Sequence, residues 1–111
     1  MKLILHITTR KEWETAVSPA AYSPPSLAAE GFIHCSTPQQ VVYAANEHFS
    51  GQSGLLLLCL DEDQLDADVV YEDCYETGTQ FPHIYGPINP EALLGVVEFP
   101  PDADGRFVLP P

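Results

Sequence analysis

The sequence predicts a single α+β domain in which two modest helices lie among several short strands. Three observations predict this class. The chain has 111 residues, enough for one hydrophobic core and for folding without disulfide bridges. Its apolar segments are mostly of strand length, and only two stretches combine a helix-start signal with a helical apolar stripe. The strands and helices do not alternate regularly, so an α+β arrangement fits better than a βαβ series.

The first predicted elements are a strand and a short helix. Residues 2–8 alternate as a strand, with Leu3, Leu5 and Ile7 on one face and Lys2, Ile4, His6 and Thr8 on the other. A helix should start at Thr9, because Thr9 and Glu12 form a capping box. Pro19 ends this helix, and a proline-containing loop then leads to a helical turn at residues 26–30.

The most informative stretch is residues 32–36, Phe-Ile-His-Cys-Ser, which is aromatic and β-branched and follows Gly31. This profile is typical of a buried strand. Alternation places Phe32, His34 and Ser36 on one face, with the Cys35 thiol turned away from them. Residues 81–86 repeat the design, with His83 and Tyr85 on a common face. We expect the two strands to meet.

The second helix and a central strand follow residue 36. Residues 37–49 begin with a threonine cap, a proline at the first helical position and a glutamine at the capping-box position, and Gly51 marks the end. Residues 55–60 are apolar on both faces, which predicts a central strand.

The remaining segments are predicted to be short. Residues 61–76 hold eight of the sixteen acidic residues and should form a solvated loop around a strand at 69–72. A calcium loop is disfavoured there, because Asp66 stands where an EF-hand needs glycine. A capped turn at 89–91, a strand at 94–99 and a hairpin turn at Asp104-Gly105 before a strand at 107–109 complete the prediction.

Composition and charge exclude several classes of function. The net charge is −12, from 16 acidic and 4 basic residues, and such a field repels nucleic acid and anionic lipid. No apolar run approaches the ~20 residues of a membrane helix. The three cysteines, Cys35, Cys59 and Cys74, have no CxxC spacing, so we expect no disulfide framework and a cytoplasmic location. Nothing in the pattern predicts an oligomeric state, and Arg10 is the best candidate to meet an anionic ligand.

Three strand histidines are the strongest functional signal. His6, His34 and His83 each have a hydroxyl-bearing companion two residues away, and these companions are Thr8, Ser36 and Tyr85. If the strands converge, they form a polar pocket inside an apolar domain. Such a pocket is costly unless every group is paired, so it often marks function.

Four interpretations of this pocket stay open. The histidines could bind zinc together with Glu72, although no HxH or HxxxH spacing supports it. Cys35 could act as a nucleophile beside a histidine, although alternation favours a core position for it. The pocket could recognise a sugar or nucleotide through histidine, tyrosine and a carboxylate. The histidines could also be purely structural and bond backbone carbonyls.

Several strings together resemble a known family. They are Leu5-His6-Ile7 followed by Trp13, the stretch from Glu30 to Ser36, Tyr71-Glu72, and the stretch from Phe81 to Pro87. The chain resembles the small bacterial family catalogued as domain of unknown function 952, from Leu3 to about Phe107. That family is grouped by structure with the ADP-ribosyltransferase-like proteins. The resemblance implies two small, twisted, mainly antiparallel sheets that form a cleft, which in the enzymes holds nicotinamide dinucleotide.

The same resemblance implies roles for individual residues. His6 would bond the nicotinamide-side ribose, the strand at 32–36 would pack near the nicotinamide, and Glu72 would be the glutamate, with Glu98 a weaker candidate. We therefore predict a small-molecule site with these catalytic candidates: His6, His34, Glu72, His83 and Tyr85. The candidate ligand-binding residues are Thr8, Arg10, Phe32 and Ser36. No metal is included, and nicotinamide dinucleotide is implied by resemblance alone.

Two functions follow from these predictions. The first is a small-ligand protein whose pocket binds or acts on a nucleotide or an ADP-ribose-like compound. The alternative is a non-catalytic binding or accessory module that has kept an enzyme-like fold. The acidic composition and the absence of a QxE or ExE glutamate signature motivate the alternative.

Overall fold

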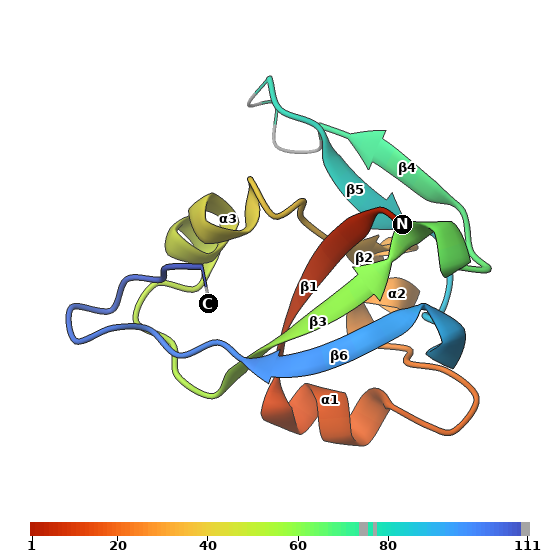
Figure 1. Cartoon of the computed structure of the whole chain (residues 1–111), viewed down its shortest axis with the longest axis horizontal. Helices are drawn as coiled ribbons and strands as arrows, with labels where there is room; N and C mark the ends of the chain where they lie inside the picture. Colours follow the sequence, from red (N-terminus) through yellow and green to blue (C-terminus); the bar gives the residue numbers. More distant parts are fainter. Residues whose placement is uncertain (74–75, 77, 110–111) are drawn as a thin grey trace.

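A computed structural model describes residues 1–73, 76 and 78–109, which form two three-stranded antiparallel sheets (Figure 1). The first sheet has the order β1–β3–β6, with bounds Leu3–Thr9, Leu55–Asp61 and Leu93–Glu98. The second has the order β2–β5–β4, with bounds Ile33–His34, Phe81–Ile84 and Val69–Glu72. The prediction of an α+β fold with two small antiparallel sheets is confirmed, and so is the meeting of the two histidine strands, where His34 lies opposite His83.

The two sheets are joined at one point and part beyond it. The backbone groups of Leu5 in β1 and Ser36, just after β2, exchange two hydrogen bonds of 2.7 and 2.8 Å. In this antiparallel register the next bonded pair would be Ile7 and His34. Instead, the imidazole Nδ1 of His6 bonds the carbonyl oxygen of His34 at 2.6 Å. A side chain thus takes the place of the next ladder bond, and β1 and β2 separate there.

In the described part of the chain, three short helices and two 3₁₀ turns connect the strands. Their bounds are α1 Arg10–Ala16, α2 Pro25–Glu30, α3 Val41–His48, η1 Glu62–Gln64 and η2 Pro90–Ala92. The helix start at Thr9 is confirmed, since its hydroxyl accepts a 3.0 Å bond from the Glu12 backbone N–H. The described residues contain one helix more than the two that the sequence predicts. The turn expected at 26–30 is the helix α2, which ends at Gly31 in the left-handed conformation (φ 88°).

The start of α3 lies further along the chain than the sequence predicts. Residues 38–40 form a turn, and the helix proper begins at Val41. The Gln40 side chain still closes half of the capping box, because its Oε1 accepts from the Thr37 N–H at 3.0 Å. Its Nε2 donates to the Gln80 carbonyl at 2.7 Å, so the same residue also ties the start of α3 to the segment before β5.

The predicted strand at 107–109 is wrong. A turn is present, with the Asp102 N–H bonded to the Arg106 carbonyl at 2.8 Å. The backbone of Phe107, however, bonds a side chain instead of a strand: its N–H donates to Asn46 Oδ1 at 2.8 Å, and its carbonyl accepts from Asn46 Nδ2 at 3.3 Å. Since one amide takes both backbone groups, Phe107 has none left for a ladder, and its ring is buried against Phe99.

The hydrophobic core has two parts that share the central strand β3. One buried cluster comprises Ile4, Tyr22, Ile33, Cys35, Leu58, Leu60, Ile84 and Ile88. The other comprises Leu5, Val41, Ala45, Leu55, Leu57, Phe99 and Phe107. This confirms β3 as a strand buried on both faces. In the part of the chain that the structure describes, no helix is long and apolar enough to cross a lipid bilayer.

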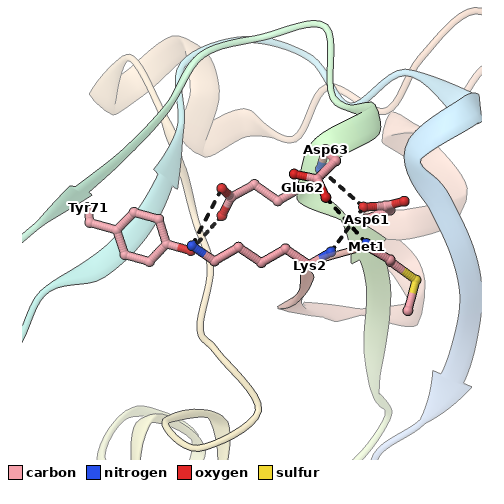
Figure 2. A network of polar contacts seen from close by, with 6 residues as sticks. All are labelled: Met1, Lys2, Asp61, Glu62, Asp63 and Tyr71. Atoms are coloured by element: carbon pink, nitrogen blue, oxygen red, sulfur yellow. Dashed lines mark hydrogen bonds and ion pairs between the residues drawn. The ribbon is translucent and has the colours of Figure 1, made fainter.

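A polar network fastens the start of β1 to the segments that follow β3 (Figure 2). The Lys2 backbone N–H bonds Asp61 Oδ1 at 3.3 Å, and its ammonium lies 3.8 Å from Glu62 Oε2. The Tyr71 hydroxyl donates to Glu62 Oε1 at 2.5 Å, and the Lys2 ammonium lies 4.6 Å from the centre of the Tyr71 ring. Met1 joins the network through its amino group, 3.5 Å from Asp63 Oδ2. We call these residues the N-terminal network.

Candidate functional site

A cavity of about 340 Å³ lies where β1 and β2 part. One wall of the cavity is formed by β1 and the start of α1. The polar residues of this wall are His6, Thr8, Thr9 and Glu12. The other polar lining residues are Ser26, His34, Ser36 and His48. Apolar surface is supplied mainly by Leu5, Ile7, Ala44, Phe49 and Phe81. The cavity therefore combines an apolar lining with several hydrogen-bonding groups.

His6 is held in one tautomer at this cavity. It is 7% exposed, and its Nδ1–H donates to the His34 carbonyl, because a carbonyl oxygen can only accept. Burial lowers the pKa of His6 to about 4, against a smaller opposing effect of the bond to His34. The ring is therefore neutral near pH 7, and its Nε2 carries a lone pair and no hydrogen.

His6 and Ser36 each bring to the lining a polar atom with no partner among the described residues. Neither His6 Nε2 nor Ser36 Oγ makes a hydrogen bond to any described residue. Yet within the described ranges no buried side-chain nitrogen or oxygen atom lacks a partner. Both atoms must therefore be open to solvent, and the space that adjoins both residues is the cavity. His6 Nε2 can accept a hydrogen bond from a ligand, and the Ser36 hydroxyl can either donate or accept one.

Thr8 differs from its neighbours, because its hydroxyl already has a partner. Thr8 Oγ1 lies 2.9 Å from the Tyr22 hydroxyl, and both side chains are buried. Burial raises the pKa of Tyr22 to about 12, so its hydroxyl stays protonated and can donate. Thr8 therefore supports the wall of the cavity and has less capacity for a ligand than Ser36.

A second cluster lies on the same strand face as His34 and Ser36. The Phe32 ring stacks on the His83 ring, with centroids 4.2 Å apart, and also contacts the rings of His34 at 4.8 Å and Tyr85 at 5.4 Å. His34 and His83 meet edge to face at 5.1 Å. We call Phe32, His34, His83 and Tyr85 the aromatic face. His34 belongs both to this face and to the cavity lining.

Glu72 is fixed beside the aromatic face. Its Oε1 lies 2.8 Å from His83 Nδ1 and accepts from the Tyr85 hydroxyl at 2.5 Å. The Tyr85 bond, and then the His83 bond, hold the pKa of Glu72 below its usual range. Glu72 stands opposite Phe81 in the β4–β5 register, and Phe81 lines the cavity. An ionised carboxylate thus borders the cavity without lining it.

The structure separates the sequence-predicted site residues into three groups. His6, Thr8, His34 and Ser36 line the cavity. The adjoining cluster consists of Phe32, Glu72, His83 and Tyr85. Within it, the His83 side chain is fully buried. Arg10 lies elsewhere: its guanidinium pairs with Glu98 at 2.8 Å, and neither residue lines the cavity.

Sequence reasoning missed several lining residues, notably Glu12, Ser26 and Phe49. The sequence predicts a capping-box role for Glu12 and places Phe49 at the end of a helix, and neither prediction indicates a site. A polar residue one turn into the helix after the His6 strand is a signal that could have indicated Glu12. Ser26 carried no comparable signal, because its place depends on how α2 folds back toward β2.

The metal and thiol interpretations find little support in the geometry. Among residues 1–73, 76 and 78–109, no three His, Cys, Asp or Glu side chains converge so that they could hold a metal ion. Cys35 is buried, and burial raises the pKa of its thiol far above the usual range, so no thiolate forms there near pH 7. Cys35 and Cys59 are free thiols, while Cys74 lies outside the described residues.

Comparison with known proteins identifies the family. The model of the family described as "Protein of unknown function (DUF952)" matches residues 7–96. The chain belongs to this family. DUF952 membership agrees with the resemblance seen in the sequence, and no curated protein matches the chain.

Solved structures of one relative show the same DUF952 fold. The crystal structure of protein CC0527 from Caulobacter crescentus is 32% identical, covers 96% of this chain and 94% of that chain, and superposes with a TM-score of 0.83. The solution NMR structure of CC0527 is 30% identical, covers 96% of this chain and 91% of that chain, and has a TM-score of 0.72. Both are described as structural-genomics targets, with no activity named.

Proposed function

We propose that this DUF952 domain binds a small molecule with a ribosyl or similar hydroxyl-bearing group, and that His6 Nε2 is its anchor. The observation that carries the proposal is the unpartnered Nε2 of a neutral, tautomer-fixed imidazole at a cavity of about 340 Å³. This volume is within the range of small-molecule sites, which are mostly apolar with a few placed polar groups. The lining has that composition.

The ADP-ribosyltransferase-like grouping supports a ribosyl ligand in particular. That resemblance implies a ribose-binding histidine on an early strand beside a cleft between two small sheets, and His6 matches it by position. Nicotinamide dinucleotide, ADP-ribose and the nucleosides they contain are therefore the first compounds to test. The Phe32 strand would take the place that the resemblance assigns beside the base.

Binding is tested with a substitution that removes only the anchoring atom. Asparagine at position 6 can place its side-chain N–H near the position of Nδ1 and keep the bond to the His34 carbonyl, but it has no atom at Nε2. A ligand at a hundred times its dissociation constant should stabilise the wild type by about 2.7 kcal/mol. We expect this rise in melting temperature with the wild type and its loss in His6→Asn.

Ser36→Ala tests the second open polar atom, and exposed Ser53, which does not line the cavity, provides the matched control Ser53→Ala. We expect weaker binding in the first variant and unchanged binding in the second. If no ribosyl compound, nucleotide or sugar shifts the melting temperature of the wild type, the proposal is wrong.

A second candidate function is catalysis on the same ligand. The specific observation in its favour is the position of Glu72. Its carboxylate accepts hydrogen bonds from Tyr85 and His83, which keep it ionised. Glu72 lies directly opposite the lining residue Phe81 in the β4–β5 pair. A carboxylate there could stabilise the positive charge that develops when a glycosidic bond to ribose breaks. Nicotinamide release from nicotinamide dinucleotide, measured in wild type and Glu72→Gln, separates this candidate from a non-catalytic module. Binding without release would favour the module.

A further inference from the structure

We infer that the ligand of this cavity is rich in hydrogen-bond donors and carries no phosphate, and that an unphosphorylated nucleoside is its chemical class. This inference rests on the proposed function and narrows it. It depends on which polar atoms of the lining are unpartnered and on which charges lie near them.

Four polar groups of the cavity bond no described residue, and all four can accept a hydrogen bond. His6 Nε2 can only accept, because the ring proton is on Nδ1. Glu12 lines the cavity, and its carboxylate makes no hydrogen bond or ion pair with any described residue. The hydroxyls of Ser26 and Ser36, which bond no described residue, can either donate or accept. A ligand satisfies such a lining with hydroxyl or N–H groups, which a nucleoside has and a phosphate group lacks.

The charges near the cavity also disfavour phosphate. None of the four lysine and arginine residues lines it, although all four lie in the described part of the chain. Arg10 follows the lining residue Thr9, but its guanidinium is 2.8 Å from Glu98 Oε1. A phosphate would therefore meet the Glu12 carboxylate and the field of a chain with net charge −12, without a lysine or arginine in the lining to neutralise it.

The apolar part of the lining fits the base of a nucleoside. Ile7 and the rings of Phe49 and Phe81 line the same cavity as the acceptors. Aromatic and aliphatic side chains bury a flat heterocycle, while the acceptors bond the sugar hydroxyls. The two halves of a nucleoside thus match the two kinds of lining, and neither half calls for a positive charge on the protein.

The test compares each nucleoside with its own 5′-phosphate by calorimetry at low ionic strength. Adenosine with AMP and nicotinamide riboside with nicotinamide mononucleotide are suitable pairs. We expect the wild type to bind at least one nucleoside roughly tenfold or more tightly than its phosphate, since one unit of charge repulsion at a partly buried site has that order of magnitude. Glu12→Gln should reduce this preference.

The matched control is Glu14→Gln, which removes the same charge from an exposed position of α1 that does not line the cavity. It should leave the preference unchanged. Equal or tighter binding of the 5′-phosphates overturns the inference while leaving the proposed function in place. Binding of neither member of any pair, nor of ADP-ribose, overturns both.

Discussion

The start of β1 and the cavity beside its middle carry polar side chains in opposite situations. At the start of β1, the N-terminal network pairs its charges with one another: Lys2 lies against Glu62 and Tyr71, and its backbone N–H bonds Asp61 (Figure 2). At the cavity, His6 Nε2 and the Glu12 carboxylate make no bond to any described residue. Met1, Lys2 and Asp63 of the network are exposed and Asp61 is buried, whereas His6 is 7% exposed without a partner for its Nε2 among the described residues.

This difference separates a structural role from a binding role. Exposed groups lose little hydration, so pairing among them adds little stability and calls for no ligand. A nearly buried acceptor with no protein partner is different, because its hydration is reduced and only the contents of the cavity can replace it. To recognise a binding site, it is thus more informative to know which polar atoms remain unpaired than to count the polar residues in a segment.

The largest effect on stability that we expect comes from the pH dependence of His6. The pKa of His6 is about 4 in the folded chain and about 6.5 in the unfolded chain, so between these values only the unfolded chain binds the proton. Stability therefore falls as the pH drops from 6.5 toward 4. His6 alone should account for a loss of about 2 kcal/mol between pH 7.5 and pH 5.

Urea unfolding of wild type and His6→Asn at these two pH values measures this loss. Other titrating groups are common to both proteins, so the difference between their pH slopes isolates His6. His6→Asn should be the less pH-sensitive protein. Parallel slopes would show that His6 is protonated as easily in the folded chain as in the unfolded chain, and that its Nε2 is not held as a neutral acceptor.

The next effect concerns a hydroxyl pair that is satisfied. Tyr22→Phe removes the partner of buried Thr8 Oγ1 and should cost about 1–2 kcal/mol, because the remaining hydroxyl is left with only a 3.5 Å contact to the Thr9 carbonyl. Ser36→Ala, by contrast, removes a hydroxyl that bonds no described residue, and should change the free energy of unfolding by less. Urea midpoints of the two variants test this order.

A double-mutant cycle sharpens the comparison. Thr8→Val combined with Tyr22→Phe should cost less than the sum of the two single changes, because the pair interacts. Additive costs would show that the Thr8–Tyr22 bond does not support the cavity wall. If Ser36→Ala lowered the free energy of unfolding as much as Tyr22→Phe does, the Ser36 hydroxyl would not be open.

Much of the fold could be predicted because its determinants are local. The alternation of residues 2–8, the apolar run at 55–60 and the Thr9 cap depend on neighbouring residues, and each has its predicted structure. The errors arose where a distant side chain decided the outcome. Asn46 takes the backbone groups of Phe107 and prevents a strand, and no local pattern reports a bond across 61 positions.

The arrangement of several candidate site residues was predictable for the same reason. Strand alternation placed His34 with Ser36 and His83 with Tyr85, and the pairing of β2 with β5 brings the two strands together. The sequence could not indicate that the His6 imidazole replaces a ladder bond and opens a cavity at that point. Nor could it indicate that Phe32 would stack on His83, which is fully buried and does not line the cavity.

The smallest effect is expected at the N-terminal network. Lys2→Met removes an exposed ammonium that lies 3.8 Å from Glu62 Oε2 and over the Tyr71 ring. The urea midpoint should fall by less than in Tyr22→Phe, and the difference from wild type should nearly vanish in 1 M NaCl, where the Debye length is about 3 Å. Lys11→Met, which removes the same charge from an exposed position of α1, is the matched control. If Lys2→Met were as costly as Tyr22→Phe at high salt, paired groups at the exposed start of β1 would matter as much as buried ones, and the contrast between the N-terminal network and the cavity would no longer hold.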